Sequence, residues 1–481
     1  MKSLAKNSIY NILYRCLNVL FPLIISAYVS RILMAEGIGK VASAQNIVTY
    51  FAIFAALGLP TYGVKKIAEN DDRKVLSQTF SELFVINFVS SVICTILYYV
   101  MIFTVPYFED KISLFVIVGL QIVFNIINVD WFYQGREEYG YIMLRSFIVK
   151  IISLMAVFGF VKTSDDFIVY ALIQTLVKVF NYVFNIVHIK KYIDFQIRGL
   201  HITTHLKPIF ILLAASLAIE VYTLADTTML SIMCNDQVVG YYSNARKVID
   251  IIRTLVTAIC AVFLPRLSFY YANDKKQEFM NLANKGLKIL GFLSIPAAVG
   301  LALLADDFVL VMFGTAFSST ILTIRILSIS IVTVALSNFI GYQVLVTVGK
   351  EKAMFMSTLF GAISNIILNY ILIRSLQHNG AAIASVITEF IVAILQFIAV
   401  KELLMVKIEK KYVISTLFSL ILMITAVMIV KRCMSTIWCE IIVACLAGSV
   451  VYVVTSIGFG NEIARLMYDH IKIMNKRRKN K

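Results

Sequence analysis

Charged and amide side chains recur at helical spacing inside otherwise apolar segments. Residues three, four or seven positions apart lie on one face of a helix. A charge facing lipid near the bilayer centre costs roughly 2.5–3.5 kcal/mol on insertion scales, so we expect these faces to line a shared polar cavity. For the uncharged members, hydrogen bonding between helices is an open alternative. The stripes are Asn11, Arg15 and Asn18; Gln121, Asn125 and Asn128; Gln174, Lys178, Asn181 and Asn185; Ser216, Glu220, Thr223 and Thr227; Arg246, Asp250, Arg253 and Thr257; Thr358, Gly361, Asn365 and Asn369; and Ser385, Glu389 and Gln396.

These stripes could bind an anionic substrate and a coupling ion. The candidate substrate-binding residues are Arg15, Arg31, Lys178, Arg246, Arg253, Arg325, Asn11, Asn18, Asn181 and Asn365. The candidates for carrying a coupling H⁺ or Na⁺ are Glu220, Asp226, Asp250 and Glu389, because buried carboxylates titrate near neutral pH. Two alternatives stay open: Arg31 and Arg246 could extend from helix ends to the interface, and Asp250 could simply neutralise Arg246 and Arg253.

Signatures of catalysis and of metal binding are missing from the sequence. It contains no Walker A, GxSxG or HExxH motif, so we predict no enzyme and no catalytic residue. His201 and His205 lie four residues apart, but a metal pair there is the weaker interpretation. Seven cysteines include no CxxC pair and lie mostly in apolar runs, which favours small buried side chains over a zinc site or disulfides. We therefore predict neither a metal nor another cofactor, apart from a coupling ion.

The elements that hold these residues are membrane-spanning helices. Hydrophobic residues make up 60% of the 481 residues and charged residues only 15%, whereas a soluble domain has about 25% charged residues. Unpaired backbone cannot face lipid, so helices are expected, with room for about fourteen. The predicted class is an all-α polytopic membrane protein. The apolar runs are 9–33, 41–62, 80–105, 112–133, 147–162, 166–188, 208–233, 245–264, 287–312, 321–347, 354–374, 380–400, 412–430 and 436–459.

The distribution of lysine and arginine predicts an orientation. The formal net charge is +16, but the basic residues separate apolar runs instead of forming one face, so nucleic acid is not an expected partner. Placing the N-terminus in the cytoplasm puts most Lys and Arg residues inside, Arg145 and the C-terminal KIMNKRRKNK among them. We therefore predict a multi-pass protein of the bacterial cytoplasmic membrane with both termini in the cytoplasm.

A weak internal repeat divides the predicted helices. The segments 30–48 and 231–249 align at an offset of 201 residues, which pairs Gly39 with Gly240. Six helices separate the copies, so the repeat would be parallel, about an axis normal to the membrane. The predicted organisation is two pseudo-symmetric six-helix lobes, 1–205 and 206–405, followed by 406–481 with helices thirteen and fourteen and a basic tail.

Four stretches resemble the O-antigen and capsule repeat-unit flippases, the polysaccharide-export branch of the MATE-like multidrug/oligosaccharidyl-lipid/polysaccharide superfamily. They are the N-terminal stretch from KNSIYNILYR to PTYGVKKIA, then VDWFYQGREEYGYIMLRS, ADTTMLSIMCNDQVVGYYSNARKV and FLPRLSFYYANDKKQEF. The resemblance runs through the first twelve helices. It implies a fourteen-helix, two-lobed transporter that moves undecaprenyl-diphosphate-linked oligosaccharide to the outer leaflet by alternating access through a central cationic cavity.

The partners implied are the lipid-linked oligosaccharide, membrane lipid, and a polymerase with other polysaccharide-assembly proteins. Three other functions are open. A cation-coupled multidrug exporter of the same superfamily would use the carboxylates, and a lipid II flippase would share the general fold. A polymerase or acyltransferase is the weakest alternative, because polymerases of this pathway generally have a large external loop and the longest polar segments here are short.

Overall fold

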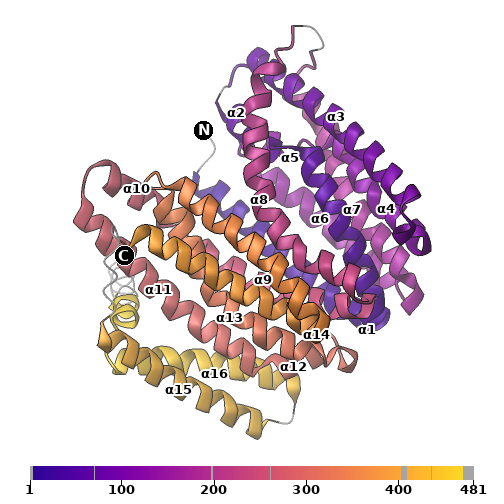
Figure 1. The fold of residues 1–481 in the computed structure, drawn as a ribbon. Helices are drawn as coiled ribbons and strands as arrows, with labels where there is room; N and C mark the ends of the chain where they lie inside the picture. The colour runs from indigo at the N-terminus through magenta and orange to yellow at the C-terminus, as the bar shows by residue number, and fades with distance from the viewer. Residues whose placement is uncertain are drawn as a thin grey trace. The chain divides into compact units, whose positions relative to one another are not determined.

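The computed structural model describes residues 4–69, 71–196, 199–260, 262–401, 409–434 and 436–469. For residues 4–9, 11–13, 15, 16, 19, 20, 215, 216, 218, 219, 221 and 222 it describes the backbone alone. The secondary structure of the described residues is helical throughout (Figure 1). The chain forms two compact units, Met1–Ser243 and Asn244–Lys481. The predicted division into six-helix lobes after residue 205 stays a prediction.

Unit 1 contains eight α-helices and the start of a ninth within its described residues. They are α1 (Leu4–Ala56), α2 (Leu59–Ala68), α3 (Arg73–Thr104), α4 (Ile112–Phe124), α5 (Asp130–Gly135), α6 (Tyr139–Phe160), α7 (Phe167–His188) and α8 (Thr203–Met233), with short 3₁₀ turns η1 (Pro106–Lys111), η2 (Asn125–Ile127), η3 (Ser164–Asp166) and η4 (Ile189–Lys191). The ninth helix, α9 (Asp236–Cys260), continues into unit 2. Helix α1 packs against α3, α4, α6, α7 and α8.

Unit 2 is built from the remaining helices. They are α10 (Leu264–Ala272), α11 (Lys276–Leu303), α12 (Ala305–Met312), η5 (Thr315–Phe317), α13 (Thr320–Asn338), the π-helix η6 (Phe339–Leu345), α14 (Glu351–Val400), α15 (Lys410–Cys433) and α16 (Ile437–Gly458). Helix α13 packs between α11 and α14, and α15 packs against α16. Tyr412 of α15 and Tyr452 of α16 donate hydrogen bonds to the α11 carbonyls of Lys288 and Phe292, at 2.7 and 3.1 Å.

Two of the long helices change direction at one residue. Helix α1 has non-helical backbone at Met34, with φ of 57°, and α14 has it at Gln377, with φ of 50°. Each of these helices covers two of the predicted apolar runs. Among the described residues, 11 helices are long and apolar enough to cross a membrane, which agrees with a polytopic all-α protein. The predicted number of fourteen stays a prediction.

The predicted run 112–133 is not one continuous helix. Helix α4 ends at Phe124 and is followed by η2 and α5. The break frees backbone carbonyls, which must find other donors when they are buried. Asn87 of α3 supplies them, because its Nδ2 donates to the carbonyls of Asn125 and Ile126 at 2.7 and 3.1 Å. A polar residue of a neighbouring helix therefore stabilises the interruption.

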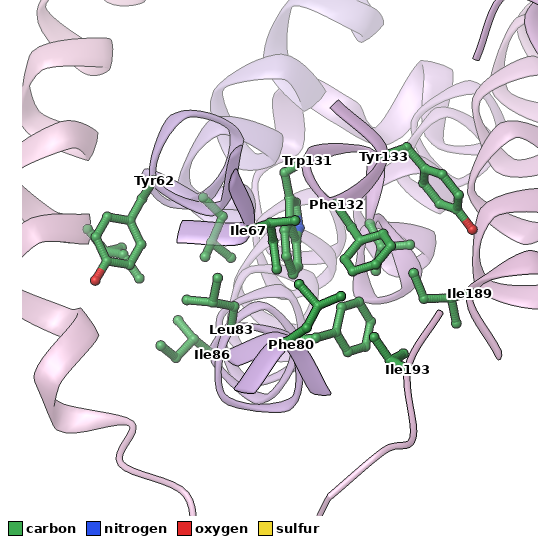
Figure 2. Packing of buried hydrophobic residues seen from close by; sticks show 14 of the residues in the cluster. Tyr62, Ile67, Phe80, Leu83, Ile86, Trp131, Phe132, Tyr133, Ile189 and Ile193 are labelled. Atoms are coloured by element: carbon green, nitrogen blue, oxygen red, sulfur yellow. The ribbon is translucent and has the colours of Figure 1, made fainter. Parts of the chain in front are cut away.

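The interruption places aromatic residues of α5 in a core between α2 and α3. Figure 2 shows the rings of Trp131 and Phe132 beside Phe80 of α3 and Ile67 of α2. The ring centroids of Phe80 and Trp131 are 5.5 Å apart in a stacked pair. A Cβ atom at Gly63 would lie 2.7 Å from the Trp131 ring, so glycine is needed for this close approach. This core fixes the start of α5 and hence the position of Asp130.

Candidate functional site

Lys178 projects from the middle of α7 towards a glutamine of α4. Its Nζ donates to Gln121 Oε1 at 2.6 Å, and Gln121 Nε2 donates to Thr175 Oγ1 at 3.3 Å. Gln121 is buried, whereas Lys178 is exposed. Two of the predicted stripes thus meet, one from α4 and one from α7. The buried amide orients the amine without neutralising its charge.

A second amine, Lys150 of α6, also has an amide oxygen as its partner. Its Nζ donates to Asn18 Oδ1 of α1 at 2.5 Å and lies 6.0 Å from the centroid of the Phe21 ring. Among the residues that the structure describes, neither Lys150 nor Lys178 has a carboxylate within ion-pair distance. Lys150 is not among the predicted site residues, although a single lysine inside the apolar run 147–162 was the available signal.

The predicted cytoplasmic end of the α7 stripe is a buried ionic network. Arg145 Nη1 donates to Asp130 Oδ1 at 3.0 Å and to the Asn185 side-chain oxygen, and Asn185 Nδ2 donates to Asp130 Oδ1. The Arg145 side chain is only 5% exposed, against 33% for Asp130. Arg145 lies in the second turn of α6, which begins at Tyr139, and it pairs inside the unit. Its predicted place on the cytoplasmic side stays a prediction. Asn181 lies beside this network and donates to the carbonyl of Val177 at 2.6 Å.

The remaining predicted residues of unit 1 do not gather around these amines in the described contacts. Asp226 is buried and accepts a hydrogen bond from Tyr242 Oη at 2.5 Å. Glu220 is half-buried and accepts one from Thr223 Oγ1 at 3.2 Å. Arg31 is exposed. The side chains of Asn11 and Arg15, both on α1, lie outside the described residues.

Unit 2 contains a line of ionic contacts along α9 that reaches α14. Arg246 Nε donates to Asp250 Oδ1 at 2.9 Å, and Arg253 Nη1 lies 3.5 Å from the same oxygen. Arg253 Nη2 lies 3.8 Å from Glu389 Oε1 of α14. Arg253 is 8% exposed, and its buried Nε and Nη2 have no hydrogen-bond partner among the described residues. Arg253 is therefore a buried cation with donors to spare beside Glu389.

Two other predicted residues of unit 2 have described contacts. Asn365 and Asn369 are buried, and Asn369 Nδ2 donates to Asn365 Oδ1 at 3.0 Å. Arg325 lies near the start of α13, where its side chain is 45% exposed and pairs with Asp306 at 2.7 Å. The substrate-binding roles of Asn365 and Arg325 stay predictions.

The histidine pair is not arranged as a metal site. His201 is exposed, whereas His205 is buried and hydrogen-bonded to Tyr62 and Glu82. Within the described part of the chain, no group of three or more His, Cys, Asp or Glu side chains is arranged to hold a metal ion.

Comparison with protein families shows which family the chain belongs to. A family model described as "Polysaccharide biosynthesis protein" matches residues 4–270, more than half of the sequence. The chain belongs to this polysaccharide biosynthesis family. The match includes Lys150, Lys178, the Arg145–Asp130 network and Arg253. A second model, MatE, matches residues 212–371.

Two related proteins match this chain along almost their whole length. A Shigella dysenteriae protein named as an O-antigen transporter is 23% identical over 82% of this chain and 100% of its own length. The Staphylococcus aureus capsular polysaccharide biosynthesis protein CapF is 22% identical over 81% of this chain and 98% of its own length.

Two solved structures of membrane transporters show the same fold. The lipid II flippase MurJ in an inward closed conformation aligns with a TM-score of 0.78 at 17% identity, over 94% of this chain and 98% of MurJ. An inward-facing MATE multidrug transporter of the MOP superfamily aligns with a TM-score of 0.64 at 15% identity, over 80% and 94%. This chain of the polysaccharide biosynthesis family therefore has a fold found in membrane transporters.

Proposed function

We propose that this protein translocates undecaprenyl-diphosphate-linked oligosaccharide repeat units across the bacterial cytoplasmic membrane for the synthesis of capsule or O-antigen. Support comes from the family, from relatives of nearly full length named for O-antigen transport and capsule biosynthesis, and from the transporter fold. We also propose that both termini lie in the cytoplasm, as the lysine and arginine distribution predicts.

The observation that carries the substrate assignment is the pair of amines in unit 1. Lys178 and Lys150 hold amide oxygens in place of carboxylates. A cation in an apolar helix bundle without an anion is costly, and an anionic ligand lowers that cost. A diphosphate supplies two adjacent negative groups and strong acceptor oxygens. The two amines would bind it, while amides such as Asn181 accept and donate hydrogen bonds with sugar hydroxyls.

The ionic contacts of unit 2 supply the proposed coupling site. Glu389 is buried and lies 3.8 Å from Arg253. Protonation of this carboxylate would remove its attraction for Arg253 and release the guanidinium to an anion. Asp226 and Glu220 are weaker candidates, because each already accepts a hydrogen bond at one carboxylate oxygen, from Tyr242 and Thr223 respectively. Arg246 and Asp250 would act by positioning Arg253.

The test is charge removal in a strain whose surface polysaccharide depends on this protein. Lys178→Ala and Lys150→Ala should each reduce surface polysaccharide at least tenfold, with lipid-linked repeat units accumulating on the inner leaflet and normal amounts of protein in the membrane. Lys178→Arg should retain part of the export, because the positive charge remains. Lys162→Ala is the control, since Lys162 is exposed in the connection between α6 and η3.

The outcome also separates the alternatives. Normal export by the double variant Lys178→Ala/Lys150→Ala would refute the anion site. If deletion of the protein leaves surface polysaccharide unchanged but raises drug susceptibility, the MatE match over residues 212–371 reflects a multidrug exporter. If deletion depletes outer-leaflet lipid II instead, the protein is a cell-wall precursor flippase.

A further inference from the structure

An apolar groove lies on α15, beside the end of α16 in unit 2. Its volume is about 430 Å³, and it is lined by Lys411, Ile414, Ser415 and Phe418 of α15 and by Phe459, the residue that follows α16. The spacing of the four α15 residues places them on one face of the helix. Ile414, Phe418 and Phe459 are each about half exposed, and the ring centroids of the two phenylalanines are 5.8 Å apart. The groove therefore presents a hydrocarbon wall, with Lys411 at the end nearest the start of α15.

A second cation, Arg465, lies beside Lys411 at this end of the groove. Gly460, which follows α16, has a left-handed backbone with φ of 74°. A Cβ atom at Gly460 would lie 3.1 Å from Arg465 Nη2 and 3.2 Å from Lys411 Cε. Glycine therefore allows both basic side chains to approach the same backbone position. Both side chains are exposed, so a ligand can reach them.

A buried asparagine fixes this arrangement. Asn461 has no exposed surface, and its Nδ2 donates to the hydroxyls of Ser415 and Thr416 on α15, at 3.0 and 3.1 Å. Its Oδ1 accepts from the backbone N–H groups of Ile463 and Ala464, at 3.0 and 3.4 Å. One side chain thus joins α15 to the helical turns that carry the second cation. The two cations and the apolar wall are held together by hydrogen bonds inside the protein.

The acidic residues nearest to the two cations in the sequence pair with a different lysine. Lys288 of α11 contacts Glu409 Oε1 at 3.4 Å and Glu462 Oε2 at 2.6 Å. Within the described part of the chain, neither Lys411 nor Arg465 has a carboxylate within ion-pair distance. The end of the groove is therefore positively charged and complementary to an anion.

Both cations lie where a membrane-spanning helix meets the polar boundary of the bilayer. Helices α15 and α16 pack side by side (Figure 1), and each is long and apolar enough to cross a membrane. Lys411 belongs to the first turn of α15 and Arg465 follows the end of α16, so both lie at the same end of this helix pair. Basic side chains at helix ends extend to the level of the lipid phosphates, and basic pockets between spanning helices bind anionic headgroups.

We propose that this groove is a binding site for an anionic phospholipid of the surrounding bilayer. The lipid phosphate accepts charge-assisted hydrogen bonds from Lys411 and Arg465, and one acyl chain lies against Ile414, Phe418 and Phe459. The apolar wall favours a lipid over free phosphate, since phosphate alone gains nothing from it.

The polar groups of the groove also distinguish a phospholipid from a glycan-bearing lipid. Apart from the cations, Ser415 is the polar side chain among the described lining residues. Its hydroxyl donates to the carbonyl of Tyr412 at 3.0 Å and accepts from Asn461. The groove thus offers sugars few hydrogen-bonding groups, and the inference holds for any substrate that the protein moves.

The test is native mass spectrometry of the full-length protein in detergent, titrated with phosphatidylglycerol or with phosphatidylcholine of the same acyl chains. We expect the tightest phosphatidylglycerol to bind at least tenfold more strongly than phosphatidylcholine, which has no net charge. The double variant Lys411→Gln/Arg465→Gln should weaken phosphatidylglycerol binding at least tenfold, because each basic residue near an anionic lipid contributes a factor of about five. Phe418→Ser should also weaken it, because the acyl chain loses part of its wall.

The chain provides a matched control in Lys410, an exposed lysine that does not line the groove. Lys410→Gln should leave the affinity within about twofold of the unmodified protein. Equal affinity for the two lipids would overturn the proposal, as would an equal loss in Lys410→Gln and in the double variant. Displacement of phosphatidylglycerol by millimolar inorganic phosphate would show a free-anion site and also overturn it. If the double variant does not fold, a loss of about fivefold in Lys411→Gln alone supports the proposal, and no loss counts against it.

Discussion

Gly39 of α1 and Gly240 of α9 lie against each other's helices in a reciprocal contact. A Cβ atom at Gly39 would lie 1.7 Å from the carbonyl oxygen of Asp236, and one at Gly240 would lie 1.9 Å from that of Ala35. Asp236 and Ala35 each precede their glycine by four residues. The two glycines are the pair that the 201-residue repeat aligns. The repeat itself stays a prediction.

The contact between Gly39 and Gly240 predicts that a single methyl group at either position destabilises the fold strongly. Gly39→Ala or Gly240→Ala should destabilise the protein by more than about 2 kcal/mol, because backbone atoms cannot move aside as flexible side chains can. Gly159→Ala in α6 is the control, since no atom of another described segment lies within 4 Å of its Cβ position. It should have no cost, because alanine favours helix. Thermal unfolding in one detergent measures the difference, and equal midpoints for all three variants would contradict the contact.

The Arg145–Asp130 pair predicts unequal effects of removing its two members. Asp130→Ala leaves Arg145, whose side chain is 5% exposed, without its charge partner, whereas Arg145→Met leaves a carboxylate that is 33% exposed and still bonded to Asn185. An unpaired buried charge costs about 3–5 kcal/mol, so Asp130→Ala should lower the unfolding temperature further. The double variant should recover much of the loss. A larger loss for Arg145→Met would show that the arginine is hydrated.

Glu389 provides a prediction about coupling. If its carboxylate carries the coupling proton, Glu389→Gln should reduce gradient-driven transport at least tenfold while substrate binding persists, because glutamine cannot release a proton. Transport into proteoliposomes with and without a proton gradient measures this. Asp250→Asn is the comparison, since Asp250 also contacts Arg253 but its side chain is 48% exposed. Gradient dependence that survives in Glu389→Gln would exclude this residue as the coupling group.

The helical architecture was largely predictable from the sequence because lipid imposes one dominant rule. A run of about twenty apolar residues must be helical, and the helices α7 and α15 begin and end within two or three residues of the predicted runs. Asn365 and Asn369, which the stripe spacing places on one helix face, are both buried, whereas the α7 stripe runs from the exposed Lys178 to the buried Asn185. Whether these faces line a cavity stays a prediction.

The partners of the polar residues were not predictable, because they lie far apart in the chain. Nothing near Arg145 indicates Asp130 and Asn185, and Lys150 has its partner 132 residues away. The change of direction in α1 occurs at Met34, with φ of 57°, and not at the nearby glycines Gly37 and Gly39, so residue type did not indicate its position. His205 suggested a metal pair with His201, whereas its partners come from α2 and α3.

The change of direction at Met34 involves one residue, and the backbone on both sides of it is helical. An added or removed residue therefore cannot be absorbed by a loop. One inserted or deleted residue in a helix rotates everything beyond it by about 100°. Between Met34 and Asn46 such a change would turn Gly39 away from Gly240 and Asn46 away from Thr228, to which it now donates at 2.6 Å. Relatives should therefore keep the number of residues constant here and vary in length at the surface connections. An epitope tag inserted after Met34 would disrupt folding, while a tag in an exposed connection such as the one at Lys162 would be tolerated.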